Sequence, residues 1–451
     1  MNGLFEKGRI KRLNQVQYIA AGFFLIILLG TIMLMSPLAS RNGDITNFLD
    51  ALFTATSATC VTGLVVYDTW LHWSMFGQLI ILTLIQIGGL GFITISVGFA
   101  MAFQQKIGLR QRDRIKESVN ALEIGGIVKL TKKILMGTLL FEGIGALLLS
   151  IRFIPRFGWI RGLYFGIFHS VSAFCNAGFD LMGGQGPYSS FVNYVGDPMV
   201  NLVLMALIVI GGIGFIVWND VSTKHFHWKQ FSLNTKLVIC VTALLIFGGA
   251  FFLFLFEQGN TLKGLSAGEQ ILASLFGSVT ARTAGFNTVD TGALRPESKF
   301  LTIILMFIGG SPGSTAGGIK TTTFMVVVLY VVSNLRGESG CNVFHRRISD
   351  DVIKKACMIF CLNLTLGVIS TLAIMATSSL ELTDVLFEVY SAISTVGMTT
   401  GITRDLNEIG RMIIILLMYC GRIGSMTFVL SLIQKPDSKK LTLPAEKITI
   451  G

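Results

Sequence analysis

The sequence predicts an all-α membrane protein in which four pseudo-symmetric helix–pore-loop–helix repeats surround one central pore. Hydrophobic residues make up 52% of the 451 residues and charged residues only 14%, with a mean hydropathy of +0.69. Soluble domains do not have this composition. Several apolar segments reach the roughly 20 residues that a helix needs to cross a bilayer. A short glycine-containing stretch also recurs four times at nearly even intervals, which indicates four quarters built on one plan.

The recurring stretch places small or hydroxyl residues before a glycine. The copies read SATCVTGL, SAFCNAGF, TARTAGF and SAISTVGM, and their glycines are Gly63, Gly178, Gly285 and Gly397, spaced by 115, 107 and 112 positions. Glycine adopts conformations closed to other residues, so such a chain can run extended with its carbonyls turned to one side. Four copies converging on one axis would form rings of carbonyls able to replace the water around a dehydrated monovalent cation. A simple turn would explain one copy, but not four evenly spaced ones.

Each quarter repeats one order of segments: an apolar span, a shorter amphipathic segment, the glycine stretch and a second apolar span. The middle segments are too short to cross a bilayer and fit re-entrant half-helices, so we expect eight spans and four half-helices. The first spans are 16–35, 134–154, 237–256 and 352–376, the middle segments 47–56, 164–171, 269–279 and 383–390, and the second spans 73–101, 199–217, 301–332 and 412–432.

The first span resembles a signal peptide, because basic residues precede it and small residues follow it. Its apolar run is longer than the about 7–15 residues of a signal peptide, and it occupies the place of the first span in each later quarter. We therefore expect a retained span. The repeats are expected at 1–105, 106–224, 225–336 and 337–434, followed by a cytoplasmic C-terminal tail at 435–451.

The net charge of +11 fits a membrane protein. Lys and Arg concentrate in the joins between quarters, which predicts that these joins and both termini face the cytoplasm. Arg152, Arg156 and Arg161 break this rule, since the layout places them outside, and we expect them to tolerate exposure there. Nucleic-acid binding explains the charge less well, because no basic stretch carries interleaved aromatic residues.

The second spans carry a further glycine motif. Gly88 to Phe92 matches Gly211 to Phe215, whereas in the third quarter the motif opens into Gly309 to Thr321, which contains a proline and repeated glycines. Such a segment cannot stay helical, and irregular backbone at membrane depth is tolerated where it is buried or lines a water-filled path. We expect a movable obstruction beneath the glycine stretches. A phosphate-binding loop is disfavoured, because Ile319 intrudes before Lys320 and membrane spans flank the segment.

Arg422 stands within the second span of the fourth quarter. A charge at this depth is costly and usually faces the bundle interior or a water-filled cavity. At about 5 Å and an effective dielectric near 20, it would repel a passing monovalent cation by roughly 3 kcal/mol, enough to slow leakage without closing the pore. The alternative is an arginine that packs at a helix break and donates to carbonyls, and the two roles can coexist.

Several other polar residues lie in or near the apolar segments. Glu142 and Glu388 are expected to pair with basic groups or to cap half-helices, and His169 is expected to be a packing residue. Four acids follow the glycine stretches and either give the outer mouth a negative field that concentrates cations or are simply solvated. These acids are Asp68, Asp180, Asp290 and Asp405.

Taken with the glycine-rich break at 309–321 and the arginine at 422, the four repeats resemble the Trk/Ktr/HKT superfamily of potassium transporters, and within it the KtrB branch, the membrane subunits of bacterial Ktr systems. The likeness covers nearly the whole chain. It implies a potassium-selective ion-translocating subunit of a gated bacterial uptake system that moves K⁺ down its electrochemical gradient. A glycine in the first repeat, where some sodium-favouring plant relatives have serine, implies potassium selectivity. The implied filter residues are Val61, Thr62, Gly63, Asn176, Ala177, Gly178, Thr283, Ala284, Gly285, Thr395, Val396 and Gly397.

The resemblance also implies a gate, partners and a location. The third glycine stretch is one residue shorter than the second, which leaves its carbonyl register open. The protein would be a homodimer in the bacterial plasma (inner) membrane with one pore per protomer, docked on a cytoplasmic nucleotide-binding regulatory ring, with the tail near an interface. No cofactor is expected in this chain: K⁺ is the transported ion, Na⁺ a possible activator, and nucleotide acts only through the partner. The implied gate residues are Gly309, Gly310, Ser311, Pro312, Gly313, Ser314, Thr315, Ala316, Gly317, Gly318, Lys320 and Arg422.

Two alternatives remain from the residues alone. One is a tetrameric ion channel or the channel-like subunit of a pump, which would share the carbonyl chemistry. The other is a multi-pass membrane enzyme built around His169, Asp180 or Cys175, which would need a constellation of histidine and acid partners.

Overall fold

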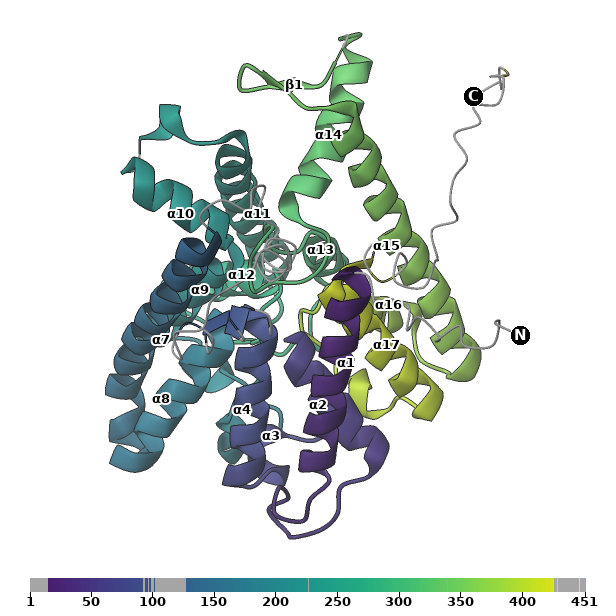
Figure 1. Ribbon diagram of the computed structural model, residues 1–451. Helices are drawn as coiled ribbons and strands as arrows, with labels where there is room; N and C mark the ends of the chain where they lie inside the picture. The colour runs from purple at the N-terminus through teal and green to yellow at the C-terminus, as the bar shows by residue number, and fades with distance from the viewer. Residues whose placement is uncertain are drawn as a thin grey trace, which may run out of the picture.

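The computed structural model describes residues 15–91, 127–225, 227–338 and 340–425, with isolated positions outside these ranges. It is almost entirely helical (Figure 1). The join around 102–126 and the tail expected at 435–451 lie essentially outside the described residues, as do half of 92–101 and most of 426–432 at the ends of two expected second spans. The one small sheet is a hairpin in the described part, between β1 (Asn342–Val343) and β2 (Arg346–Arg347).

The first spans fold as four long helices, close to the expected ranges. Within the described ranges, these four are the helices that are individually long and apolar enough to cross a membrane. Apolar side chains such as Leu29, Leu139, Phe247 and Ile369 are exposed on them, as expected for surfaces that face lipid. These helices are α1 (Gln15–Leu34), α7 (Ile127–Phe157), α11 (Leu233–Glu257) and α15 (Asp350–Thr377).

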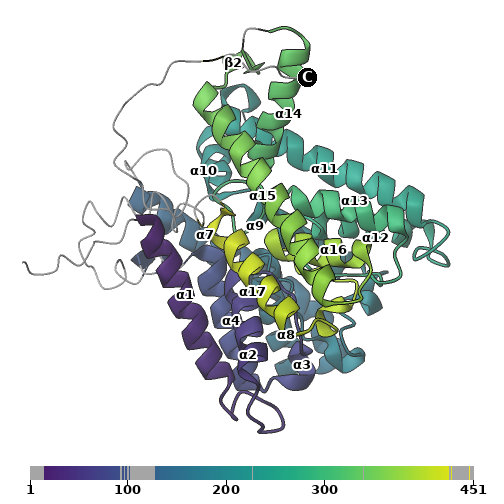
Figure 2. The ribbon, with the colours of Figure 1, turned by 90° about the vertical axis from the view of Figure 1, so that its right-hand side faces the viewer.

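The middle segments form four shorter helices of 12–16 residues, and each extends further toward its glycine than hydropathy indicated. Ser266 and Glu269 form a capping box at the start of one of them. Each helix contributes a fully buried phenylalanine near the same place relative to its glycine, namely Phe53, Phe168, Phe276 and Phe387. The helices are α2 (Phe48–Cys60), α8 (Trp159–Phe174), α12 (Ala267–Thr280) and α16 (Leu382–Ile393), and their C-terminal ends are buried. Figure 2 shows α16 beside α15.

The second spans are not continuous, and the expectation of unbroken helices in the first, second and fourth quarters is wrong. The helices end at the glycine motif, where Gly91, Gly214 and Gly424 have φ values of 80°, 99° and 95°. A right-handed helix cannot contain such backbone. In the second quarter the chain bends by 94°. The helices are α4 (Met75–Leu90), α9 (Pro198–Gly212) with α10 (Phe215–Lys224), α13 (Pro296–Phe307) with α14 (Thr321–Leu335), and α17 (Glu408–Ile423).

Four short helical segments complete the outer loops. One is the α-helix α3 (Thr69–His72), and the others are the 3₁₀ helices η1 (Met182–Gln185), η2 (Val192–Tyr194) and η4 (Ile402–Arg404). A further 3₁₀ turn, η3 (Trp228–Gln230), precedes α11.

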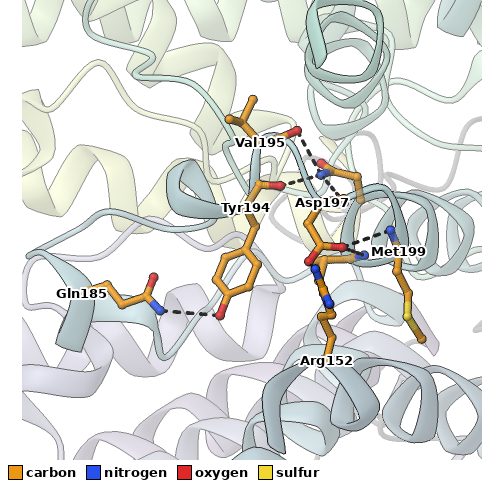
Figure 3. A network of polar contacts seen from close by, with 8 residues as sticks. Arg152, Gln185, Tyr194, Val195, Asp197 and Met199 are labelled. Carbon is orange, nitrogen blue, oxygen red and sulfur yellow. Dashed lines mark hydrogen bonds and ion pairs between the residues drawn. The ribbon is translucent and has the colours of Figure 1, made fainter. Parts of the chain in front are cut away.

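The arginines that break the charge rule have specific partners. Arg152 forms an ion pair with the Asp197 carboxylate, which also caps α9 by accepting from Met199 N (Figure 3). The Arg156 guanidinium lies 4.5 Å from the ring centroid of Tyr194, and that of Arg161 lies 5.8 Å from Trp70. An ion pair and cation–π contacts hold these side chains in place. These contacts give each of the three arginines a partner on a neighbouring segment.

Ion pairs join neighbouring quarters near the outer loops. Arg411 Nη1 lies 2.6 Å from Asp50 Oδ1, and the hydroxyl of Tyr67 donates to Asp50 Oδ2 at 3.0 Å. Lys299 and Asp384 are joined at 2.9 Å between the third and fourth quarters. The first of these contacts links the last quarter back to the first.

We expect Arg411→Ala to lower the free energy of unfolding by roughly 3 kcal/mol, because it leaves the buried Asp50 carboxylate without its cation. Thermal unfolding of the detergent-solubilised protein measures this. The double variant Asp50→Asn with Arg411→Gln removes both charges and should lose much less. An unchanged melting temperature in Arg411→Ala would contradict the expectation.

Candidate functional site

The structure brings the four repeated glycines together in a closed ring. A Cβ atom built on Gly63 would lie 3.1 Å from Gly178 Cα, one on Gly178 would lie 3.0 Å from Gly285 Cα, one on Gly285 would lie 3.2 Å from Gly397 Cα, and one on Gly397 would lie 2.9 Å from Gly63 Cα. These distances are tighter than nine in ten real Cβ contacts, and a carbonyl oxygen of the neighbouring quarter would lie closer still to each Cβ. A side chain at any of the four positions would therefore strain the ring or displace a carbonyl of the neighbouring quarter.

The residue before each glycine contributes a carbonyl to the same ring. The Ala284 oxygen would lie 2.6 Å from a Cβ on Gly178, and the oxygens of Ala177, Val396 and Thr62 are equally close to the other three glycines. Each glycine thus faces the carbonyl of the next quarter.

In each stretch a residue with negative φ separates two residues with positive φ. The residue two before each glycine has a positive φ: 58° in Val61, 59° in Asn176, 79° in Thr283 and 51° in Thr395. The glycines themselves have φ values of 70–95°. Left-handed backbone is costly for β-branched residues, and strain of this kind persists only where the surroundings enforce it. Its appearance at the same place in all four quarters points to a shared local geometry.

A hydroxyl group at the start of each stretch forms a hydrogen bond with the backbone at the end of that stretch. Ser57 Oγ accepts from Gly63 N at 3.0 Å and Ser391 Oγ from Gly397 N at 3.1 Å, whereas Ser172 Oγ donates to Phe179 O at 2.7 Å and Thr280 Oγ1 to Phe286 O at 2.6 Å. The shorter third stretch is accommodated between Thr280 and Thr283, and its glycine keeps its place in the ring. The register left open by the sequence is therefore the same in all four.

Three hydroxyls of the stretches have no hydrogen-bond partner within the described ranges, although they are buried: those of Thr59, Thr62 and Thr395. Buried polar groups are normally paired, so unpaired ones mark places where water or a ligand binds.

The second-span glycine motif packs directly behind three of the stretches. A Cβ built on Gly88, Gly211 or Gly421 would collide with the carbonyl oxygen of Thr59, Phe174 or Ile393 respectively. Each of these carbonyls lies four residues before its ring glycine. The broken second spans are therefore shaped to admit the ends of the half-helices.

The glycine-rich segment 309–320 is an irregular loop beneath the ring. It fills the break between α9 and α10, since Ser311 N donates to Gly212 O at 3.0 Å and Phe215 N to Gly313 O at 2.7 Å. Thr315 Oγ1 donates to Phe174 O, at the end of α8, at 3.2 Å. On the opposite side a Cβ on Gly318 would lie 3.1 Å from Ser394 Cβ. The loop thus spans from the second quarter to the fourth.

Arg422 ties this loop to the first quarter. Its guanidinium donates to the carbonyls of Thr315 in the loop and of Gly88 and Gly89 at the end of α4. The packing role weighed from the sequence is therefore present, and it coincides with a position beside the loop. Lys320 closes the loop on itself, with Nζ donating to Ala316 O at 2.7 Å.

Neither intramembrane glutamate pairs with a basic group within the described ranges, which corrects that expectation. Glu142 accepts from Gln86 Nε2 at 3.2 Å and lies 3.9 Å from Cys175 Sγ. Glu388 accepts from the hydroxyls of Thr399, at 2.7 Å, and Thr403, at 2.5 Å. Each carboxyl group bonds to polar side chains beside a glycine stretch and does not cap a half-helix.

His169 and two of the outer acids are occupied by backbone contacts. His169 Nδ1 donates to Phe165 O at 2.7 Å and Nε2 accepts from Leu181 N at 3.0 Å, so the ring packs as expected. Asp68 is buried and caps α3. Burial, together with the nearby Asp68, raises the pKa of Asp180 to about 7, although Met182 N donates to it. A solvated role is wrong for Asp68, and among the described residues no catalytic constellation forms around His169.

Sequence reasoning missed two groups of residues at this site. The hydroxyls at the start of the stretches and the packing glycines behind the stretches were visible as repeats, but only their contacts show what they do. Arg282, inside the third stretch, went unremarked although it is 93% buried. Aligning the four copies on their glycines would have shown it as the one charged residue among them.

Comparison with known proteins agrees with this geometry. The protein-family model named TrkH, described as a cation transport protein, matches residues 10–442 of this chain. The potassium/sodium uptake protein NtpJ of Enterococcus hirae is 43% identical over 99% of this chain and 100% of its own. The Ktr system potassium uptake protein B of Bacillus subtilis is 41% identical over 98% of this chain and 97% of its own. The Ktr system potassium uptake protein B of Vibrio alginolyticus is 35% identical over 97% of this chain and 95% of its own.

A solved structure shows the same fold. The crystal structure of the potassium transporter TrkH from Vibrio parahaemolyticus has a TM-score of 0.71 and covers 95% of this chain and 86% of its own, at 20% identity. With the apolar helices, these matches identify a multi-pass membrane protein that is a transporter and not an enzyme. The chain belongs to the TrkH family of cation transport proteins.

Proposed function

We propose that this chain is the potassium-selective translocating subunit of a gated bacterial uptake system. The observation that carries the proposal is the closed ring of Gly63, Gly178, Gly285 and Gly397, in which each glycine faces the preceding carbonyl of its neighbour. Backbone carbonyls in rings replace the hydration shell of K⁺. The three residues ending at each glycine form the filter: Val61, Thr62, Gly63, Asn176, Ala177, Gly178, Thr283, Ala284, Gly285, Thr395, Val396 and Gly397.

The buried hydroxyls support the same assignment. Among the described residues, the hydroxyls of Thr59, Thr62 and Thr395 have no hydrogen-bond partner, and hydroxyl oxygens are ligands of the same kind as carbonyls. The names of the relatives agree on the ion, since each names potassium uptake and one also names sodium.

The loop 309–320 with Arg422 is the gate in this proposal. It crosses beneath the ring from the second quarter to the fourth, and the arginine fastens it to α4 in the first. K⁺ sheds its water in the filter and passes when the loop moves aside. The inward membrane potential drives it with about 2.3 kcal/mol per charge per 100 mV.

The proposal places the protein in the bacterial plasma membrane as a homodimer, with both termini in the cytoplasm. The relatives named as parts of Ktr systems support a multi-component assembly, in which a nucleotide-binding cytoplasmic ring moves the gate. Sodium stimulates uptake in this proposal without a site assigned to it.

Cation flux into liposomes that hold the purified protein tests the function. We expect K⁺ flux at least tenfold above Na⁺ flux under the same gradient, because the ring is built for a dehydrated potassium ion. Empty liposomes, and any inward leak of a cation that the protein does not conduct, provide the baseline. Equal K⁺ and Na⁺ fluxes would refute potassium selectivity.

A further inference from the structure

The third quarter departs from the other three at one position beside the ring. Three residues before each glycine, at the end of the half-helix, stand Cys60, Cys175, Arg282 and Ser394. Only the third quarter has a charge there. Because the four quarters share one backbone geometry, this position has a similar surrounding in each.

Arg282 is buried without a counter-charge. Its side chain reaches α11, where Nη2 lies 3.4 Å from Thr242 Oγ1, and its Nε has no partner within the described ranges. Among the described residues no carboxylate lies within ion-pair distance of it. It lines a small cavity with Ile208, Gly212 and Gly310, between α9 and the loop 309–320. Its charge is therefore neither neutralised nor solvated as a surface arginine would be.

Arg422 provides the contrast. That guanidinium has three carbonyl acceptors, which spread its charge over the end of α4 and the loop. Arg282 instead lies just past the C-terminal end of α12, where its backbone N donates to Val279 O at 3.1 Å. The carbonyl end of a helix carries a partial negative charge that favours a nearby cation. At the end of α12 the full positive charge of Arg282 opposes this partial charge.

We propose that Arg282 sets the ion affinity of the filter, as a fixed positive charge behind the third strand that weakens K⁺ binding and so speeds its release. The inference rests on the proposed function. Conduction requires binding that is favourable enough for entry and weak enough for exit. An uncompensated charge about one arginine side chain from the ion path acts through a medium of low dielectric, so its effect there is large. In this proposal Arg282 acts on the ion through its charge and does not touch the ion.

The test removes the charge while keeping the shape. Arg282→Gln loses the charge and keeps a donor for Thr242, Arg282→Lys keeps the charge, and Thr242→Val keeps the arginine but removes its hydrogen bond. Two readouts are measured: the KM and maximal rate of K⁺ uptake in liposomes, and the K⁺ concentration that half-maximally stabilises the detergent-solubilised protein against heat.

We expect Arg282→Gln to lower the KM for K⁺ and the half-stabilising K⁺ concentration by roughly three- to tenfold, with a lower maximal rate. Arg282→Lys and Thr242→Val should stay within about twofold of the native values on both readouts. A role confined to packing would lower stability in the absence of K⁺ and would not increase the affinity, so the direction of the change separates the two.

An unchanged or raised KM in a folded Arg282→Gln protein would overturn the inference. Arg282→Met, which fills the same space without a polar group, is the second uncharged variant and should show the same gain in affinity. If both uncharged variants unfold while Arg282→Lys folds, the residue is structural and the inference fails. Native protein without K⁺ flux or K⁺ stabilisation would instead refute the proposed function itself.

Discussion

Gly285→Ser should abolish the preference for potassium over sodium, reducing the K⁺/Na⁺ flux ratio by roughly tenfold or more. Gly285 has a φ of 86°, which costs a residue with a Cβ about 1–3 kcal/mol. The new Cβ would also collide with the Val396 carbonyl and lie 3.2 Å from Gly397 Cα. A shift of one carbonyl changes the ring that replaces the water of the ion. Paired K⁺ and Na⁺ flux measurements in liposomes give the ratio.

The matched control is Gly268→Ser, on the same half-helix. A Cβ at Gly268 meets nothing within 4 Å, and serine is tolerated near the start of a helix. This variant should keep the native ratio. A folded Gly285→Ser protein with native selectivity would remove the filter from the proposal, whatever the control shows.

Arg422→Met should increase K⁺ flux, by roughly tenfold, because it removes both a positive charge beside the ion path and the bond that fastens the loop 309–320 to α4. Arg422→Lys separates the two effects. Lysine keeps the charge, but its single ammonium cannot reproduce the fork that joins Thr315 O to Gly88 O and Gly89 O. The lysine variant should therefore lie between native and methionine variants.

The initial rate of K⁺ uptake, normalised to reconstituted protein, measures these variants. Their thermal stability must be measured alongside, since loss of a buried hydrogen-bonded arginine also weakens packing. A methionine variant that folds and conducts no faster than the native protein would contradict the gating role of the loop. A lysine variant equal to the native one would attribute the whole barrier to charge.

Repetition made the glycine stretches predictable, and hydropathy made the long first helices predictable. The broken second spans could not be found in this way. Leu90 and Ile213 continue an apolar pattern, so hydropathy reads through Gly91 and Gly214, although their positive φ values end the helices. The matching GGLGF and GGIGF motifs were the available signal. Hydropathy records which residues avoid water and carries no information on backbone handedness.

Partners of buried polar residues were the least predictable part. Glu142 bonds to Gln86, which is 56 residues away, and Arg422 to Gly88, which is 334 residues away. Charge alone suggested that each glutamate would find a cation, yet amide, thiol and hydroxyl groups surround them. The exception made by Arg152 likewise depends on Asp197, which only the packed structure brings to it. Such pairings arise from the fold and not from local sequence.

The closure of the glycine ring has a consequence for the order of folding. Contacts between the second and third stretches join residues about a quarter of the chain apart, as for Asn176 and Thr283, 107 residues apart. The contacts that join the fourth quarter to the first span far more: 361 residues for Arg411 with Asp50 and 399 for Tyr419 with Ala20. Contacts between distant residues form slowly, because a long loop must close first. One side of the first quarter therefore stays uncovered until the last quarter has been synthesised. Formation of the contacts between these two quarters is the final step of assembly.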